Sequence, residues 1–276
     1  MPFILVVESN TPELVMQTRA NGQLSEAENY AAVLRRIDHT ISIEFFSPYQ
    51  GETLPALEGC IGAVFTGSGV AWCVDDPRAD VLADAMKHIF AAGIPAYGSC
   101  NGLQLAAHVL GGRCGAAPTG REDALAREIT LTKAGESHPM MKGRALQFAA
   151  PCVHRDEVRA LPEGALLLAG NQHSQVQAMA YEEGNVCFWG SQYHPELSAA
   201  YVGEILSTIE ADPALVQALK AADYDQKVAR SLGAMNFDLT FETRTLELQN
   251  WLAMVQGRAV SSHRSFNFKL FAKPIE

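Results

Sequence analysis

Short apolar runs alternate with amphipathic stretches along the first 112 residues of the chain. The run Phe3–Val7 is apolar at every position, which is typical of a strand buried on both faces of a parallel sheet. Ser25 followed by Glu28 forms a capping-box pattern that opens a helix through about Ile37. Further strands are predicted at residues 41–46, 61–65 and 94–98, and a further helix at residues 79–93. Strands that alternate with helices predict βαβ units, and therefore a parallel sheet with helices on both faces.

The pattern changes between Arg127 and about Gly190, where short strand-like runs are separated by turns. These runs cover residues 127–134, 144–150, 164–170, 175–184 and 185–190. Such closely spaced strands are typical of hairpins, and we expect them to form one edge of the same sheet. The charged segment between the second and third runs, residues 154–164, is predicted to be helical.

The chain reads as mostly helical from Ala199 onward. Helical segments are predicted at residues 199–210, 213–233 and 241–257, and the last places Leu246, Trp251, Leu252 and Val255 near one face. No repeat or low-complexity linker divides the chain, so we expect one domain over residues 1–276. Residues 198–245 are interpreted as a helical insertion or extension within it, and residues 246–276 as a closing helix and tail. The pattern of the basic stretch at residues 261–276 does not show where this tail lies in the fold.

Composition and charge disfavour several classes of protein, among them nucleic-acid binders and membrane proteins. The net charge of −10 and the pI of about 5.3 disfavour a general nucleic-acid binder, because phosphate contacts need clustered Lys and Arg. No apolar run approaches the ~20 residues of a membrane span, and Met1–Asn10 lacks the basic start of a secretory signal. We therefore expect a cytoplasmic protein with reduced cysteines and no membrane partner. The lack of a Cys-x-x-Cys pattern disfavours a structural zinc site, and we expect neither a metal nor a cofactor.

One cysteine has the setting of a nucleophile. Cys100 lies between Gly98 and Gly102, directly after a predicted strand. A helix is predicted from about Asn101 to the stop at Gly111–Gly112. This is the arrangement of a nucleophile elbow, in which small neighbours leave room for a strained turning residue. A helix N-terminus also favours thiolate over thiol. Taken alone, the turn is equally compatible with a small buried cysteine.

A histidine and a carboxylate after another strand supply the base that such a nucleophile needs. The predicted strand at residues 185–190 leads to His194. Pro195 ends the hydrogen-bond ladder of the strand, and Glu196 follows. A carboxylate beside an imidazole fixes its tautomer and stabilises its charge. The sequence therefore predicts a triad of Cys100, His194 and Glu196.

A glycine-rich loop follows the strand predicted at residues 61–65. Its glycines let backbone N–H groups approach a ligand closely, and ligands of open α/β sheets bind at the ends of strands. One of these N–H groups, paired with that of Asn101, is a candidate to hold a tetrahedral oxyanion. The other interpretation of the loop is an ordinary strand-to-helix turn.

These segments, in this order, resemble those of the class I (triad-type) glutamine amidotransferases. The resemblance covers roughly residues 3 to 198, together with the later Glu247–Leu252. The family's elbow reads Gly-x-Cys-x-Gly-x-Gln, its triad ends in His-Pro-Glu, its oxyanion loop is often Gly-Gly-Pro or Gly-Ser-Pro, and a further segment reads His-Gly-Asp-x-Val. In this chain the elbow corresponds to Gly98, Cys100, Gly102 and Gln104, and the end of the triad to His194–Glu196. The oxyanion loop corresponds to Gly67–Gly69, and the further segment to His154–Val158.

The resemblance implies a flavodoxin-like α/β/α sandwich with a central, mostly parallel sheet and a C-terminal helical extension. It also implies that Cys100 attacks the side-chain carboxamide of glutamine, or another γ-glutamyl amide, to form a γ-glutamyl thioester. His194 would protonate the departing amine and then activate water, while Glu196 orients His194. The N–H groups of Ser68 and Asn101 would hold the oxyanion. Substrate contacts are implied at Gly67, Gln104, Val153, His154 and Arg155.

Two positions depart from the family pattern. Gly69 stands where the family often has proline, and Arg155 stands where it usually has glycine. Arg155 either alters the site for the α-carboxylate of the substrate or adds a favourable positive charge there.

The sequence leaves two enzymatic functions open, each with a small-molecule substrate. The first is a free-standing, GMP synthase-like glutaminase that passes ammonia to a separate synthetase subunit, because the chain has no nucleotide-binding loop of its own. The alternative is a γ-glutamyl amide or γ-glutamyl peptide hydrolase that uses the same triad without a synthetase. The intact triad disfavours a non-catalytic binding protein. The ammonia acceptor, the preferred amine and the existence of a homo-oligomer are left open.

Overall fold

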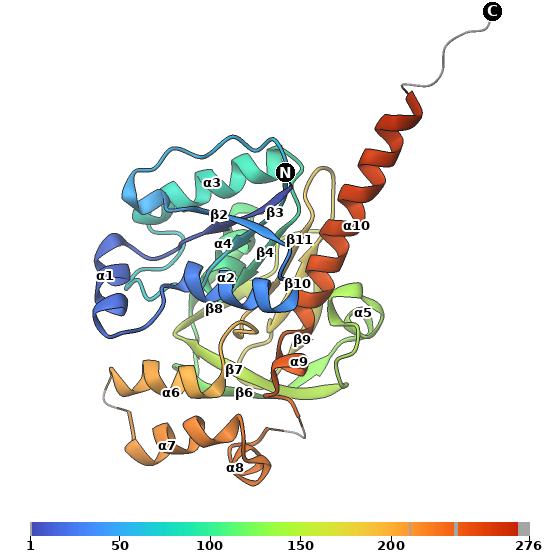
Figure 1. Ribbon diagram of the computed structural model, residues 1–276. Helices are drawn as coiled ribbons and strands as arrows, with labels where there is room; N and C mark the ends of the chain where they lie inside the picture. The colour runs from blue at the N-terminus through green and yellow to red at the C-terminus, as the bar shows by residue number, and fades with distance from the viewer. Residues whose placement is uncertain (1, 210, 235–236, 270–276) are drawn as a thin grey trace, which may run out of the picture.

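The computed structural model describes residues 2–209, 211–234 and 237–269 (Figure 1). These residues form one nine-stranded sheet and a separate pair of strands. The order across the sheet is β2 (Ser42–Phe46), β1 (Phe3–Val7), β3 (Cys60–Phe65), β4 (Ala96–Ser99), β11 (Phe188–Ser191), β10 (Ala178–Tyr181), β9 (Leu166–Gly170), β6 (Glu122–Leu131) and β7 (Gln147–His154). The pair is β5 (Arg113–Ala116) with β8 (Asp156–Ala160).

Pairing within the sheet changes from parallel to antiparallel along this order. Strands β2, β1, β3, β4 and β11 are paired in parallel, whereas β10, β9, β6 and β7 are paired antiparallel. The predicted parallel sheet with a hairpin-like edge is therefore confirmed.

Helices lie on both faces of this sheet (Figure 1). They are α1 (Pro12–Ala20), α2 (Glu26–Ile37), α3 (Asp80–Ala91), α4 (Asn101–Val109), α5 (Lys133–Ser137), α6 (Ala199–Ser207), α7 (Pro213–Ala222), α8 (Gln226–Ser231), α9 (Phe241–Arg244) and α10 (Leu246–Lys269). Short 3₁₀ turns occur at Pro48–Gln50, Pro77–Ala79 and Pro139–Met141.

Successive side chains of β1 point to opposite faces of the sheet. Helices pack on both faces, so the fold has three layers. Ile4 and Val6 belong to the core shared with α2 and α10. Leu5 and Val7 belong to the core shared with α3 and α4. Every residue of β1 is buried, as its unbroken apolar run predicts. The expected flavodoxin-like α/β/α fold is therefore confirmed.

Helix α2 begins as the sequence predicts. Ser25 Oγ accepts a hydrogen bond from the N–H of Glu28 (3.3 Å), and the Glu28 carboxylate accepts one from the N–H of Ser25 (2.7 Å). The carboxylate of Glu8, just beyond β1, accepts a further bond from the N–H of Ala27 (3.0 Å). These contacts fix the first turn of α2, which begins at Glu26, against the end of β1.

Helices α6, α7 and α8 pack together beside β6 and β7 (Figure 1). Ala149 of β7 shares a hydrophobic cluster with Val202 of α6 and Leu219 of α7. The helical segment predicted at 213–233 is divided in two, because Asp225 starts a new helix by accepting backbone hydrogen bonds from the second and third residues after it (2.8 and 3.3 Å).

The segment 154–164 is not helical, contrary to the prediction. It contains β8, which pairs antiparallel with β5, a strand that the sequence pattern did not indicate. The buried carboxylate of Glu157 in β8 pairs with Arg159 of the same strand (2.7 Å) and accepts a hydrogen bond from the hydroxyl of Ser174 (2.6 Å). A charged segment can form a buried strand where distant residues provide such partners, and those partners leave no local pattern.

The last helix closes one face of the sheet. Trp251 of α10 packs against β3 so closely that a Cβ at Gly62 would lie 2.8 Å from its ring. Its ring centroid is 6.2 Å from that of Tyr97 in β4. Leu248 is buried with Trp251, whereas Leu246 is only partly buried. The backbone helix continues to Lys269, and the end of the predicted tail, residues 270–276, lies outside the described residues.

Two further expectations concern membranes and disulfides. None of the helices in the described part of the chain is long and apolar enough to cross a membrane. The six cysteines are all free in the structure.

Candidate active site

Four neighbouring parallel strands end at the same edge of the sheet, and the residues after them form the candidate site. Asn10 comes after β1, Ser68 after β3, Cys100 after β4 and His194 after β11. The carboxyl edge of an open parallel sheet is where such folds bind their ligands.

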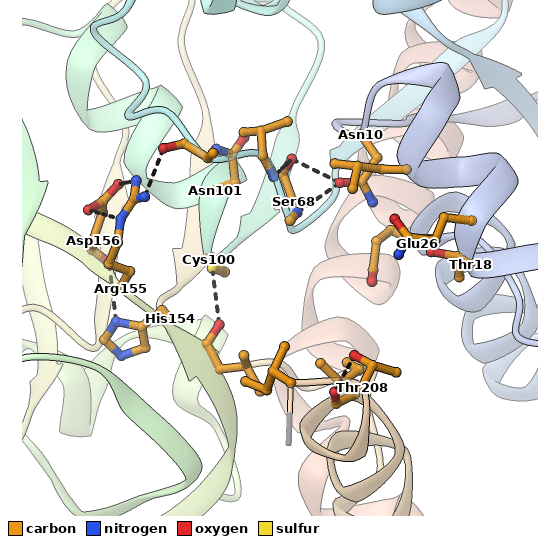
Figure 2. Close-up of a pocket in the computed structure, with 18 of the residues that line it drawn as sticks. Asn10, Thr18, Glu26, Ser68, Cys100, Asn101, His154, Arg155, Asp156 and Thr208 are labelled. Atoms are coloured by element: carbon orange, nitrogen blue, oxygen red, sulfur yellow. Dashed lines mark hydrogen bonds and ion pairs between the residues drawn. The ribbon is translucent and has the colours of Figure 1, made fainter. Parts of the chain in front are cut away.

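Cys100 occupies a strained turn between β4 and α4. Its φ of 49° and ψ of −104° lie in a region that residues with side chains rarely adopt. Its N–H donates to the carbonyl of Ser191 on β11 (2.8 Å), which holds the turn in place. The residue is 6% exposed, and its thiol lies 3.9 Å from the carbonyl of Val153 (Figure 2). This is the geometry that a nucleophile elbow requires.

The glycines on either side of Cys100 are required by close packing. A Cβ at Gly98 would lie 2.5 Å from the main-chain carbonyl carbon of Gly102. A Cβ at Gly102 would collide with the carbonyl oxygen of Phe65. The first turn of α4 therefore rests on the ends of β3 and β4. The N–H of Asn101 lies in that turn, where it has no intrahelical acceptor.

His194 and Glu196 form a buried pair beside the thiol. His194 Nδ1 lies 2.7 Å from Glu196 Oε1, and Cys100 is close enough to His194 to raise the pKa of the imidazole. The N–H of His194 donates to the carbonyl of Pro151 (2.8 Å), which attaches this loop to β7. The structure thus brings together the three residues that the sequence predicts as a triad.

A chain of hydroxyl groups leads to the same oxygen of Glu196 that faces His194. Ser99 Oγ donates to Glu196 Oε1 (2.9 Å), and the hydroxyl of Tyr30 donates to Ser99 Oγ (2.6 Å). All of these side chains are buried. Because hydrogen bonds to a carboxylate fix its orientation, this chain keeps Glu196 directed at the imidazole.

The pKa of His194 is raised well above its usual value. Burial by itself would lower this pKa, but the charge of Glu196 and the hydrogen bonds to Cys100 and Glu196 outweigh burial. The raised pKa favours the imidazolium, which is the form that can donate a proton to a departing amine.

The glycine loop after β3 is attached to the loop after β1. Asn10 Oδ1 accepts a hydrogen bond from the N–H of Gly69 (2.8 Å) and lies 3.0 Å from the hydroxyl of Ser68. A proline at position 69 would lack that N–H, which explains the departure from the family pattern. A Cβ at Gly67 would lie 2.7 Å from His194 Cε1, so the loop also rests directly on the imidazole.

Arg155 connects two walls of the site. Its Nε and Nη2 atoms form a bidentate pair with the carboxylate of Asp156 (2.9 and 2.6 Å), and its Nη1 donates to the carbonyl of Ala71 (2.8 Å). Figure 2 shows this side chain stretched along the wall. Its charge is therefore shared with Asp156, and it braces the segment after β7 against the glycine loop.

Two predicted substrate contacts, Gln104 and His154, have protein partners of their own. Gln104 Nε2 donates to the carbonyl of Asp156 (2.7 Å). His154 Nε2 lies 2.9 Å from Glu122 Oε2, and its Nδ1 lies 3.1 Å from the same Asp156 carbonyl. Both residues nevertheless line the cavity at Cys100. Their role as substrate contacts stays a prediction.

A cavity of about 410 Å³ opens at Cys100. The segment Val153–Asp156 lines one side, while α1, the first turn of α2 and α6 contribute residues to the opposite side (Figure 2). The residues of that opposite side include Leu14, Thr18, Glu26, Tyr201, Ile205 and Thr208. The extension predicted at 198–245 thus supplies part of the cavity wall.

A second polar cluster adjoins the segment after β7. Glu122, His154 and His173 each place a candidate metal-ligand atom within 4.8 Å of the others. The carboxylate of Glu122 already accepts hydrogen bonds from Asn171 (2.7 Å) and Gln177 (2.8 Å), as well as facing His154. These contacts describe a buried hydrogen-bond network, and the expectation of no metal stays untested.

Several residues of the site were not found from the sequence. Asn10 and Ser99 lie at the carboxyl ends of predicted parallel strands, and that position could have singled them out. Glu26 and Tyr30 come from α2, and nothing in the local pattern shows which part of the sheet edge this helix approaches.

Comparison with known proteins identifies the family. The family model described as glutamine amidotransferase class-I matches residues 65–205. The γ-glutamyl-L-1-hydroxyisopropylamide hydrolase of a Pseudomonas species is 28% identical over 272 residues, covering 90% of this chain and 91% of that protein. A subunit of the glutamine-hydrolysing GMP synthase of Methanoculleus marisnigri is 32% identical over 157 residues, covering 56% of this chain and 77% of that protein.

Solved structures agree in fold. A glutamine amidotransferase from Thermotoga maritima has a TM-score of 0.61 at 17% identity, covering 92% of this chain and 97% of that chain. One from Methylobacillus flagellatus has a TM-score of 0.59 at 18% identity, covering 94% of each chain. With the elbow, the loop and the matched model all falling on the same stretch of sequence, this chain belongs to the class I glutamine amidotransferase family.

Proposed function

We propose that the protein hydrolyses γ-glutamyl amides and releases an amine larger than ammonia. The observation that supports this most directly is the cavity at Cys100. Its volume of about 410 Å³ lies within the ~300–1,000 Å³ of small-molecule sites. It also extends from the thiol to α1 and α6, which leaves room for a leaving group beside the glutamyl part. The Pseudomonas γ-glutamyl amide hydrolase matches 90% of the chain, whereas the Methanoculleus GMP synthase subunit matches 56%.

Acylation would begin with attack of the Cys100 sulfur on the carbonyl carbon of the γ-amide. A new S–C bond forms, and the N–H groups of Ser68 and Asn101 hold the negative oxygen. The C–N bond then breaks while His194 gives its proton to the departing amine. The product at this stage is a γ-glutamyl thioester on Cys100 and a free amine.

Deacylation would use the same groups in reverse. His194, now neutral, takes a proton from water as the water oxygen attacks the thioester carbon. The C–S bond breaks and glutamate leaves, while the thiolate and the imidazolium are restored. Glu196, held by Ser99, keeps His194 in one orientation during both proton transfers.

The glutamyl part of the substrate is assigned to the side of the cavity formed by Val153–Asp156. Because the His154 imidazole and the Gln104 amide have protein partners, we propose that the main chain at 153–155 makes the direct contacts. Gly67 lets the main chain of the glycine loop lie directly against His194, and we propose that this main chain borders the site of the γ-carbonyl.

A glutaminase that serves a separate synthetase is the second candidate. It is favoured by the similarity to GMP synthase subunits, of which the Methanoculleus protein is 32% identical to this chain. In that case glutamine would be the preferred substrate and turnover would depend on a partner protein.

Glutamate release is the measurement that separates the two functions. The purified protein is assayed with glutamine and with a panel of γ-glutamyl alkylamides, without and with candidate synthetases. We expect higher kcat/KM for at least one alkylamide than for glutamine, with no partner required. A protein that hydrolyses glutamine best, and only with a partner, would contradict the proposal.

The cysteine variants test the mechanism in the same assay. Cys100→Ala should abolish glutamate release because no other group forms the thioester. Cys60→Ala is the matched control, since Cys60 is a free cysteine at the opposite end of β3. Activity retained in Cys100→Ala would exclude the thioester route.

A further inference from the structure

Glu26 is a carboxylate that the mechanism does not use. It is the first residue of α2, and it lines the cavity at Cys100. Its Oε2 atom is buried and has no hydrogen-bond partner among the described residues. The neighbouring carboxylates Glu8 and Glu28, in contrast, accept bonds from backbone N–H groups. The Oε2 atom therefore does not cap α2, and the partly buried side chain of Glu26 contributes to the cavity wall.

Glu26 lies on the side of the nucleophile where the amine departs. In Figure 2, Glu26 and Thr18 lie on one side of Cys100, and His154–Asp156 on the other. Glu26 also interacts electrostatically with His194 and Glu196. Because His194 must donate its proton to the departing nitrogen, the amine has to lie near His194, whose charge interacts with Glu26.

The surroundings of Glu26 fit an elongated amine. We define the amine arm as the cavity side lined by Leu14, Thr18, Glu26, Tyr201, Ile205 and Thr208. Leu14 of α1 and Ile205 of α6 add apolar side chains to the lining of the same cavity. An alkyl chain can pack between such walls while a polar end reaches the carboxylate.

An isolated negative charge at this position is unfavourable. Burial raises the pKa of Glu26 to about 8, the charges of Glu196 and Glu8 raise it as well, and His194 opposes them. Without a ligand the group is therefore mostly protonated near neutral pH. A cation in the amine arm would provide the missing partner and favour the ionised form.

We propose that Glu26 makes the amine arm a subsite for a cationic leaving group, so that the preferred substrates are γ-glutamyl amides of diamines. This inference rests on the proposed hydrolysis of γ-glutamyl amides. The second ammonium group of the diamine pairs with the Glu26 carboxylate, while its alkyl chain lies between Leu14 and Ile205. A hydroxyl group at the same place would accept or donate one hydrogen bond but would leave the carboxylate charge without a counter-charge.

Three matched substrates test this directly. They are the mono-γ-glutamyl amides of 1,3-diaminopropane, 3-aminopropanol and n-butylamine, which differ only in an ammonium, hydroxyl or methyl end. For the full-length protein we expect kcat/KM for the diamine amide to exceed the other two by on the order of tenfold or more, as partly buried charge pairs commonly give. In Glu26→Gln this preference should fall by a similar factor.

The control variants separate specificity from folding. Glu13→Gln removes an exposed carboxylate on α1 outside the cavity, and it should keep the wild-type preference. Thermal melting of Glu26→Gln should show no loss of stability, because a glutamine need not ionise in this buried position.

The outcomes distinguish this inference from the function on which it rests. Similar kcat/KM for the three amides, preference for the hydroxyl compound, or an unchanged preference in Glu26→Gln would each overturn the inference and leave the hydrolase function intact. If glutamine is hydrolysed but none of the three amides is, the proposed function fails and the inference fails with it.

Discussion

At single positions of this site only glycine fits, because neighbouring atoms lie too close to leave room for a side chain. Gly67 shows this most clearly, because a Cβ there would lie 2.7 Å from His194 Cε1. Neither the loop nor the imidazole can yield freely, since His194 is buried and paired with Glu196. Alanine at position 67 would therefore move the imidazole away from the thiol.

Gly67→Ala should lower kcat by about 100-fold or more, which is the effect of misplacing a catalytic group by about 1 Å. Steady-state kinetics with the best γ-glutamyl amide measures it, and circular dichroism checks the fold. Gly257→Ala on α10 is the matched control, because a Cβ there would meet no atom within 4 Å among the described residues outside the backbone of its own helix. A Gly67→Ala enzyme with wild-type kcat would show that the imidazole does not need its present position.

The proposed role of Glu26 has a pH dependence of definite sign. Burial raises its pKa to about 8, so the carboxylate becomes ionised as the pH rises through that value. The groups around it are Glu8 after β1, His194 and Glu196 after β11, and Tyr201 on α6. The preference for a cationic over a neutral amide should therefore increase from pH 6.5 to 9. It should decline only when the substrate ammonium, with a pKa of about 10, loses its proton.

The ratio of kcat/KM for the diamine and n-butylamine amides over this range is the measurement. Taking the ratio cancels titration of Cys100 and His194, which affects both substrates. Glu26→Gln should give a flat ratio below pH 9. A wild-type ratio that falls between pH 7 and 8.5 would contradict the assignment.

At the scale of elements, α10 supports the loop that carries His194. Glu247, in its first turn, forms an ion pair with Arg144 (2.7 Å), and both side chains are fully buried. The same carboxylate accepts a hydrogen bond from the hydroxyl of Tyr193 (2.6 Å), the residue before His194. Arg244, just before α10, donates to the carbonyl of Pro195 (2.6 Å). The loop is thus held on both sides of the histidine.

Glu247→Gln should reduce the free energy of unfolding by about 3–5 kcal/mol, because it removes the ion-pair partner of the buried Arg144. It should also lower kcat by loosening the loop at Tyr193. Urea unfolding and kinetics below the unfolding transition measure the two effects. Glu242→Gln, at an exposed position of α9, should change neither. Lost stability with an unchanged kcat would limit the role of Glu247 to the core.

Some elements could be predicted from the sequence because their causes are local. The apolar run of β1 and the capping box at Ser25 each act within a few residues, and the structure has these features where expected. The strand β8 could not be predicted, because Glu157 is stabilised by Ser174 from a distant part of the chain. A local sequence pattern reflects the secondary-structure propensity of its residues, whereas the hydrogen-bond partners of a buried carboxylate are set by the completed fold.

At the scale of the whole molecule, the site combines the beginning, middle and end of the chain. The motifs around Cys100 and His194 allow the chemistry to be proposed from the sequence, since the residues of each motif lie next to one another. The wall formed by Glu26 and Tyr201 could not be predicted, because α2 and α6 meet only in the fold. We propose that residues 1–276 form one domain, with residues 198–245 as an extension whose first helix, α6, shapes the amine arm.

The support that Glu247 gives to the loop carrying His194 also affects when the enzyme becomes active during biosynthesis. Glu247 is 147 residues after Cys100, and the ribosome adds about 5–20 residues per second. A nascent chain therefore carries its nucleophilic cysteine for roughly 7–30 s before the residue that steadies the histidine loop has been made. Catalytic competence would arrive late in translation, and prematurely terminated chains would hold a thiol without a properly supported base.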